Sequence, residues 1–379
     1  MAGKPAYHFT PDALLTALRD AGGVKLYAAR ALGCTEMTFS RHLRAAFPEG
    51  VPGEIHVNAP PGHVVSGVST LVKTPDGGLQ WVKTRAPADA AAVIDALRKS
   101  MGKIPAVPRI VAPKKGPADL LAVYCMGDPH VGMYAWGEEA GDDFDLEIAE
   151  RIMLGAAAGL VEAMPPAKEA LIVNLGDFFH ADTLDAITLR SKNHLDVDTR
   201  WNKVLRVGVR IMRQIIETAL TRHQSVRVIN EIGNHDEHTS QMLTVALSMA
   251  YEKNPRVNFD ESPAKFHYHR FGRCLIGVTH GDFVKPEALG GIMSADRAQD
   301  WGETAHRYWY TGHVHHKRLY ELPGCTVESF RTLAAKDAWH AASGYRSGRD
   351  MQGIVLHRDA GEVERHTINA VSALARSAA

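Results

Sequence analysis

Five short apolar runs of this 379-residue chain each lead directly into a cluster of Asp, Asn or His residues. The clusters are Gly127-Asp128-Pro129-His130, Gly176-Asp177, Gly233-Asn234-His235-Asp236, His280-Gly281-Asp282 and Gly312-His313-Val314-His315. Helical patterns, notably Phe144–Glu162 and Asn202–Thr221, lie between several of the runs. Buried strands that alternate with helices indicate a layered α/β domain. Because ligand groups gather just beyond the carboxyl ends of strands in such sheets, we expect the five clusters to meet.

The clusters offer seven side chains that can bind a metal ion, three with oxygen and four with imidazole donors: Asp128, Asp177, Asn234, His130, His280, His313 and His315. This mixture suits Mn, Fe or Zn better than Mg or Ca, which prefer oxygen alone. Two divalent ions about 3.5–4 Å apart can hold both ends of a phosphoryl displacement and generate a hydroxide at neutral pH. One carboxylate would have to bridge them. Glycine opens four of the clusters, because it lets a strand turn sharply into a shared pocket.

Any single cluster has a simpler explanation. A Gly-Asp at a strand end is usually a turn, and a lone His after a strand is more often a structural residue than a metal ligand. Five such clusters, each at the end of an apolar run, are not readily explained in that way.

The order of these motifs resembles that of the calcineurin-like metallophosphoesterases, over about residues 120–320. The resemblance implies an α/β fold in the form of a four-layer α/β-β/α sandwich. It also implies an enzyme, a binuclear metal-dependent phosphoesterase that hydrolyses ester bonds. One ion would then be bound by Asp128, His130, Asp177 and His315, and the other by Asp177, Asn234, His280 and His313.

The same resemblance implies roles for residues that do not bind metal. His235 would be the acid that stabilises the phosphoryl group or protonates the leaving oxygen, and Asp236 would orient it. One departure concerns the fourth motif, where many members of the family have His-Gly-His and this chain has His280-Gly281-Asp282. The ligand position is kept, but the local polarity and the leaving-group preference stay open.

The segment Gly176–His180 is similar to the Gly-Asp-x-Phe-His motif of the branch that contains double-strand-break repair nucleases. Asp128-Pro-His130-Val-Gly132 is similar to the opening motif of the same branch. These similarities imply that His180 lies beside the metals and assists phosphodiester cleavage. The alternative is that His180 is a solvent-exposed loop histidine.

Residues 1–50 predict a helix-turn-helix unit, with helices from about residue 11, over Val24–Leu32 and over Glu36–Phe47. Ala29 is small where two helices must approach, and Gly33 follows in the turn. The recognition helix would reach phosphates and base edges with four side chains, Thr38, Ser40, Arg41 and Arg44. A helical hairpin used for protein contacts is the alternative.

Charge is unevenly distributed along the chain. Residues 1–117 carry 15 Lys and Arg against 8 Asp and Glu, whereas the rest carries 28 against 35. The basic N-terminal region suggests an anionic partner, and the acidic rest of the chain suits a domain that binds cations. An uneven solvated surface is the alternative.

Residues 51–102 predict a β-hairpin connector with a short helix near Ala88–Met101. Its strands, Val64–Lys73 and Leu79–Thr84, flank a turn at Thr74–Gly78. Residues 103–117 form a Pro-rich linker, and residues 118–379 form the phosphoesterase domain. The hairpin sequence from residue 68 to 84 is similar to bacteriophage-encoded phosphoesterases.

Composition predicts a soluble globular protein, since 45% of residues are hydrophobic and 23% are charged. No apolar run reaches the roughly 18 residues of a membrane span. Met1–Pro5 lacks the apolar core of a signal peptide, and the four cysteines form no CxxC pair. We therefore expect a cytoplasmic protein (in the host cytoplasm if phage-encoded) with no membrane partner; a homo-oligomer is compatible with the sequence.

The predicted reaction is hydrolysis of a phosphodiester, with DNA as the expected substrate or partner and another phosphodiester as the alternative. Two divalent ions would be the cofactors, Mn first and Fe or Zn as alternatives. A phosphomonoesterase, or a nucleotide or protein phosphatase, is the competing enzyme. A DNA-binding regulator with an inactive phosphatase fold is the competing function outside enzymes. In the stretch Gly324–Arg349, Trp339 or Tyr345 could stack on bases, but we favour an edge strand and a loop packed on the sheet.

Overall fold

The computed structural model describes residues 9–21, 24–47, 68–73, 79–84, 108, 110–113 and 116–377. The chain divides into two compact units, Met1–Ala91 and Ala92–Ala379. Among the residues described, no helix combines the length and the apolar character needed to cross a membrane.

Three short helices open the first unit: α1 (Pro11–Asp20), α2 (Lys25–Ala31) and α3 (Glu36–Ala46). The Thr10 hydroxyl accepts a hydrogen bond from the Ala13 N–H at 3.2 Å, and the Thr35 hydroxyl accepts one from the Thr38 N–H at 3.2 Å. Caps of this kind stabilise a helix by about 1 kcal/mol. The helices share a small apolar core that comprises Leu14, Ala17, Leu18, Ala28, Ala29, Phe39 and Leu43. The three predicted helices are therefore present, and each predicted helix end lies within two residues of the observed one.

The first unit also contains a β-hairpin in which β1 (Val68–Lys73) pairs antiparallel with β2 (Leu79–Thr84). Val68 lies opposite Thr84, and Lys73 lies opposite Leu79. The predicted start of the first strand, the turn at 74–78, the helix near 88–101 and most of the Pro-rich linker lie outside the described residues.

Two mixed sheets form the second unit. The six-stranded sheet has the order β13-β12-β3-β4-β5-β6, in which the last four strands are parallel. Its strands are β3 (Leu120–Met126), β4 (Glu169–Asn174), β5 (Ser225–Asn230), β6 (Val257–Phe259), β12 (Asp350–His357) and β13 (Gly361–Asn369). The five-stranded sheet has the order β10-β11-β9-β8-β7, with antiparallel strands at both edges. Its strands are β7 (His267–Phe271), β8 (Cys274–Val278), β9 (His306–Thr311), β10 (Arg318–Leu322) and β11 (Cys325–Ser329).

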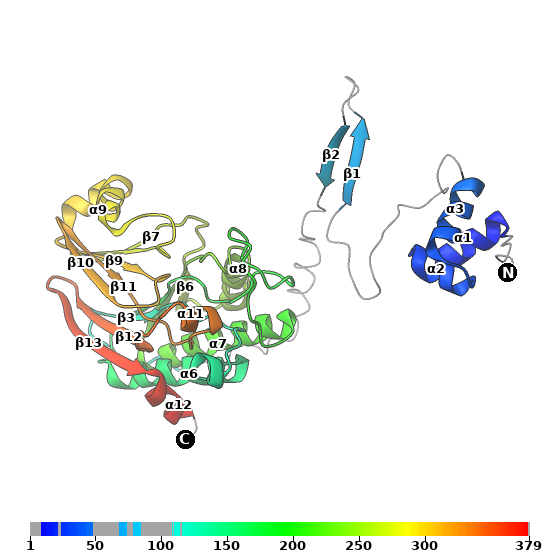
Figure 1. Ribbon diagram of the computed structural model, residues 1–379. Coiled ribbons are helices and arrows are strands. Elements are labelled where there is room, and N and C mark those ends of the chain that lie inside the picture. The colour runs from blue at the N-terminus through cyan, green and yellow to red at the C-terminus, as the bar shows by residue number, and fades with distance from the viewer. Residues whose placement is uncertain are drawn as a thin grey trace. The chain divides into compact units, whose positions relative to one another are not determined.

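Helices cover the outer faces of both sheets (Figure 1). They are α6 (Leu146–Ala163), α7 (Trp201–Arg222), α8 (Thr239–Tyr251) and α12 (Ala370–Ser377) on the six-stranded sheet, and α9 (Pro286–Asp296) and α10 (Ala298–Glu303) on the five-stranded sheet. Two further short helices, α5 (Gly137–Ala140) and α11 (Ala338–Ala342), contact each other. The long helices α6 and α7 occupy the segments that the sequence periodicity predicts.

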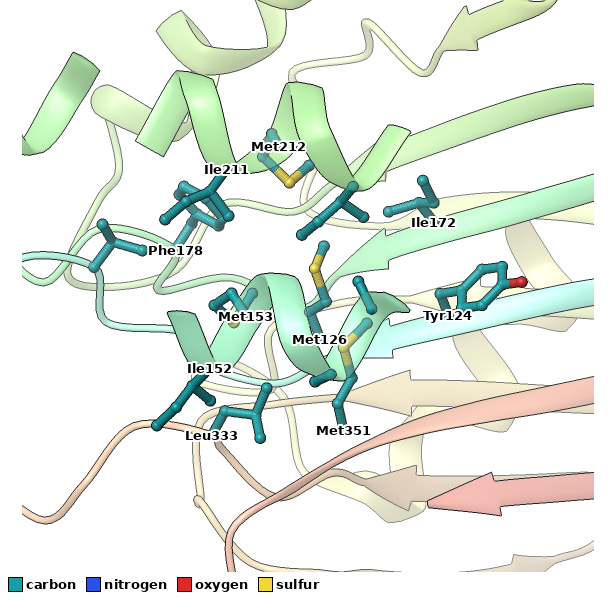
Figure 2. Close-up of a cluster of buried hydrophobic side chains, with 14 of the residues drawn as sticks. Tyr124, Met126, Ile152, Met153, Ile172, Phe178, Ile211, Met212, Leu333 and Met351 are labelled. Carbon is teal, nitrogen blue, oxygen red and sulfur yellow. The ribbon is translucent and has the colours of Figure 1, made fainter. Parts of the chain in front are cut away.

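Alternation along β3 shows how the layers are built. Ala122, Tyr124 and Met126 point into the core under α6 and α7, where Met126 lies beside Met153 and Met212 (Figure 2). The intervening Leu121, Val123 and Cys125 point the other way, into a second core between the two sheets. Successive side chains of a strand face opposite sides, so a strand buried on both faces reads as a continuous apolar run.

The outer face of the five-stranded sheet completes the sandwich. Trp309 and Leu275 project from β9 and β8 onto Leu289 and Met293 of α9. The order of layers is therefore helices, sheet, sheet, helices. The predicted α/β fold class with a four-layer sandwich is confirmed.

Candidate metal centre

The seven predicted ligands follow strands of both sheets: β3, β4 and β5 in one, and β8 and β9 in the other. The His313 N–H joins the two groups of loops by donating to both carboxylate oxygens of Asp128, at 2.9 and 3.0 Å. His280 Nδ1 donates across the same boundary to the Leu175 carbonyl at 2.8 Å. The five sequence clusters therefore meet at one place.

Five of the seven ligand residues have an unusual backbone. Their φ angles lie in the left-handed region: Asp128 at 42°, His130 at 46°, Asp177 at 50°, His313 at 67° and His315 at 55°. In the described part of the chain only two other non-glycine residues have a positive φ. Such residues are uncommon, and backbone strain of this kind gathers at functional sites.

Two of the glycines that precede ligands are required by close packing. A Cβ at Gly233 would lie 2.0 Å from Asp177 Oδ1, and one at Gly312 would lie 2.6 Å from Asp128 Oδ2. Neither glycine has a positive φ. At these two positions glycine is needed for the close approach, whereas Gly176, with a φ of 95°, also adopts the left-handed backbone expected of a sharp turn.

The first donor group consists of Asp128, His130 and His315, whose ligand atoms all lie within 4.8 Å of one another. The Nε2 atoms of His130 and His315 are 3.0 Å apart, and His315 Nε2 is 3.5 Å from Asp128 Oδ1. Two imidazoles bound to one tetrahedral metal would place their nitrogens roughly 3.3 Å apart. The spacing therefore suits a shared cation.

The second donor group consists of Asp177, His280 and His313, again within 4.8 Å. Asn234 joins it, since its Oδ1 lies 3.1 Å from His280 Nε2. Asp177 Oδ2 lies 3.2 Å from the same nitrogen. Because the Nδ1–H of His280 is held by the Leu175 carbonyl, its Nε2 is the atom left to face a metal.

The pKa values show that the buried histidines and carboxylates of this cluster strongly perturb one another. Burial lowers the pKa of His280, but the carboxylates of Asp177 and Asp128 outweigh it and raise the pKa to about 10. Burial, together with the nearby His235 and His315, holds the pKa of His130 well below its usual range. Asp128 and Asp177 are 0% and 2% exposed. Buried carboxylates need positive partners, and imidazole and oxygen donors in this proportion fit Mn, Fe or Zn.

His235 lies at the edge of both groups and is half-buried. Its Nδ1 is 2.9 Å from the His180 carbonyl, so the ring proton is on Nδ1 and Nε2 is left for another partner. The His235 backbone N–H donates to Asp177 Oδ1 at 2.8 Å. The residue predicted as the acid is thus tied to the carboxylate predicted as the bridge.

His180 is 1% exposed, which rules out the alternative of a solvent-exposed loop histidine. Its Nδ1 lies 3.2 Å from Nδ1 of His130. Its ring stacks on that of His235, with centroids 5.2 Å apart. His180 therefore lies beneath two residues of the cluster.

Asp236 contacts the backbone of two loops. Its carboxylate accepts hydrogen bonds from the Gly233 N–H at 3.0 Å, the Phe179 N–H at 3.1 Å and the Ser240 hydroxyl at 2.7 Å. The His235 ring instead donates a hydrogen bond from Nδ1 to the His180 carbonyl. Asp236 thus joins the loop after β5 to the loop after β4, a connection that the sequence motif did not indicate.

The departure in the fourth motif has a structural explanation. Asp282 forms an ion pair with Arg190, and Arg190 Nε lies 2.8 Å from Glu237 Oε1. The Asp282 carboxylate thus anchors the loop that carries Arg190.

A cavity of about 630 Å³ opens above the donor groups. Its floor includes Asp177, Asn234, His235, His313 and His315. One wall is formed by residues 188–195 and the other by residues from Asp337 to Tyr345. The second wall corrects the interpretation of the stretch Gly324–Arg349 as an edge strand and a loop, because its strand, β11, lies between β10 and β9, and residues 338–342 form α11 beside the site. The available signal was Asp337, a residue type that commonly caps helices.

The predicted recognition helix is α3 of the first unit. Ser40, Arg41 and Arg44 share one open surface depression with Met37, which is 83% exposed. Thr38 contributes to the helix cap, with its hydroxyl 2.9 Å from that of Thr35. Three of the four predicted DNA-contacting side chains thus share a surface.

No protein-family model matches the chain, and no curated protein matches its sequence. Similar solved structures include a conserved uncharacterized protein from Streptococcus pneumoniae TIGR4, described as a predicted phosphoesterase, with 12% identity and a TM-score of 0.28. The match covers 66% of this chain and 98% of that one. Another is wild-type Vps29 complexed with zinc from Entamoeba histolytica, with 13% identity, a TM-score of 0.25, and coverage of 66% and 99%. The function is therefore inferred from the geometry of the site.

Proposed function

We propose that this protein is a two-metal phosphodiester hydrolase of the calcineurin-like type, with DNA as its substrate. The observation that carries the proposal is the meeting of Asp and His side chains from both sheets in two donor groups. Asp177 contacts both groups: its Oδ2 lies 3.2 Å from His280 Nε2, and its backbone carbonyl accepts a hydrogen bond from the His130 N–H at 3.0 Å. These contacts support Asp177 as the shared ligand.

In this proposal Asp128, His130, Asp177 and His315 hold one ion, and Asp177, Asn234, His280 and His313 hold the other. Mn is the expected metal, with Fe or Zn as alternatives. When bound, a pair of such ions neutralises charge on phosphoryl oxygens and lowers the pKa of water.

His235 is the proposed acid. Its Nδ1–H is engaged by the His180 carbonyl, so a second proton on Nε2 can be donated to a phosphoryl oxygen or to the leaving oxygen. His235 also lines the cavity, which places it within reach of a substrate.

His180 and Asp236 are proposed to position other residues. His180 is buried beneath the rings of His130 and His235, and it holds His235 through its own carbonyl. Asp236 holds the backbone on either side of the centre through Gly233 and Phe179. Both would act on catalysis by keeping His235 and the ligands in place.

Three features support DNA as the substrate. The Gly176–His180 motif is similar to that of repair nucleases. Arg41 and Arg44 share an open surface in the first unit, where they can contact phosphates. The cavity above the donor groups has a volume of about 630 Å³, which is within the range of sites that hold a ligand of nucleotide size.

The test is an assay of the full chain with Mn on end-labelled single- and double-stranded DNA, beside bis-(p-nitrophenyl) phosphate and p-nitrophenyl phosphate. We expect cleavage of DNA and of the diester, and loss of both in Asp177→Asn. Activity on the monoester alone would indicate a phosphomonoesterase. A protein that binds two ions but cleaves none of these substrates would contradict the proposal.

A further inference from the structure

One wall of the cavity carries an aromatic group that the proposed hydrolysis does not require. Trp339, His340 and Tyr345 all line the cavity. The Trp339 ring lies 5.0 Å from that of His340 and 5.9 Å from that of Tyr345. Trp339 is 62% exposed. Exposed indole of this extent contributes little to the core, and aromatic surface beside a polar site is typical of ligand binding.

The wall is held in a defined position. Asp337 caps α11 by accepting from the His340 N–H at 2.8 Å, and the same oxygen lies 2.7 Å from His340 Nδ1. The His340 ring stacks on the ring of His315, with centroids 4.9 Å apart and 22° between the planes. The Tyr345 N–H donates to the His340 carbonyl at 3.0 Å. The aromatic wall is thus attached to a proposed metal ligand.

The opposite wall is polar and is shaped by a tight turn. The Thr188 N–H donates to the Asn193 carbonyl at 2.9 Å, and the Lys192 N–H donates to the Thr188 carbonyl at 3.0 Å. Lys192 has a φ of 59°, which points to a sharply constrained turn. Lys192 and Asn193 are exposed and line the cavity. One wall therefore presents flat aromatic surface, and the other presents a cation and an amide.

From this juxtaposition we propose that the aromatic wall formed by Trp339, His340 and Tyr345 stacks on the nucleobase next to the phosphate bound at the centre. A base has a flat π-face for aromatic side chains and a polar edge for an amide. A phosphorylated serine or threonine side chain, or a bare sugar phosphate, has no such face. The inference rests on the proposed function and adds to it a binding site for one base beside the proposed metal centre.

The test is calorimetric titration of the full chain, loaded with Mn, with dTMP and with 2-deoxyribose 5-phosphate, which lacks the base. Stacking on one base corresponds to a change in affinity of roughly 5- to 150-fold. We expect Trp339→Ala to weaken dTMP binding by a factor in that range and to leave deoxyribose phosphate binding unchanged. Trp339→Phe should bind dTMP within about threefold of the wild type, because stacking is tolerant of the aromatic ring used.

Met249→Ala on α8 is the control, since Met249 is 60% exposed and is not among the residues that line the cavity in the described structure. We expect it to bind both compounds as the wild type does. Equal binding of dTMP by Trp339→Ala and the wild type, or equal weakening of both compounds, would overturn the inference. If the protein cleaves DNA but binds dTMP no more tightly than deoxyribose phosphate, the base site is wrong and the proposed function stands. If it binds dTMP more tightly but hydrolyses no phosphodiester, the proposed function is wrong and the base site stands.

Discussion

The floor of the cavity and its two walls are built in different ways. The floor includes donors on left-handed backbone, such as the buried Asp177, and hydrogen bonds such as that from His313 to Asp128 join the loops of both sheets. The walls carry exposed side chains, such as Trp339 and Lys192, on a five-residue helix and a tight turn. Strained and buried residues are suited to chemistry that must not vary, whereas exposed ones can differ with the substrate.

The largest expected effect comes from the floor, with Asp177→Asn. Because this carboxylate is proposed to serve both ions, its loss should weaken both sites by more than about a hundredfold, beyond what supporting residues contribute. Metal content after dialysis, measured by elemental analysis, reports this. Asp282→Asn is the matched control and should retain two ions; if Asp177→Asn also retains two, the floor has no shared ligand.

His235→Ala separates metal binding from turnover. We expect the variant to keep both ions and to lose about 10²- to 10⁴-fold in kcat, the usual contribution of a positioned acid. Steady-state rates on bis-(p-nitrophenyl) phosphate, beside metal content, measure the two quantities. A variant with wild-type kcat would show that the proton comes from elsewhere.

A buried ion pair behind the floor should give a pH dependence of stability. His267 Nε2 lies 3.0 Å from Glu231 Oε2 in the segment that leads to Asn234. Burial lowers the pKa of His267, but Asp260 and Glu231 outweigh it and raise the pKa to about 9. The stabilisation is therefore complete below the unfolded pKa of about 6.5 and is lost as pH rises through about 9.

The expected loss is on the order of 1–3 kcal/mol, since burial also raises the pKa of Glu231 and offsets part of the gain. Denaturant unfolding between pH 6 and pH 10 measures it. His267→Gln should be less stable at pH 6 and should lack this pH dependence. A wild-type stability that rises over that range would contradict the assignment.

The smallest expected effect concerns the attachment of the polar wall. The Arg190 side chain is 40% exposed, and exposed ion pairs contribute less than about 1 kcal/mol. Asp282→Asn should therefore change the free energy of unfolding by less than that amount. KM for DNA should rise while kcat stays near that of the wild type, because only the wall is loosened. A large fall in kcat would mean that Asp282 belongs to the floor.

The floor could be predicted from sequence because every ligand follows a strand within a few residues. Each apolar run indicated both a strand and the ligands after it, and the layers were implied by the resemblance of the motif order to a known family. β3 (Leu120–Met126), for example, is the apolar run that leads into Gly127-Asp128.

The walls and the supporting contacts could not be predicted in this way, because they join residues far apart in the chain. Asp236 bonds to Phe179, and the ring of His340 stacks on that of His315. The pairing of β12 with β3 likewise joins residues 352 and 125. No local pattern records such partners, so α11 was mistaken for part of an edge strand and loop.

The most direct test of the shared centre is anomalous diffraction from crystals of the full chain grown with Mn. The account predicts two anomalous peaks about 3.5–4 Å apart, with the Asp177 carboxylate bound to both. A single peak, or two peaks that do not share Asp177, would contradict it.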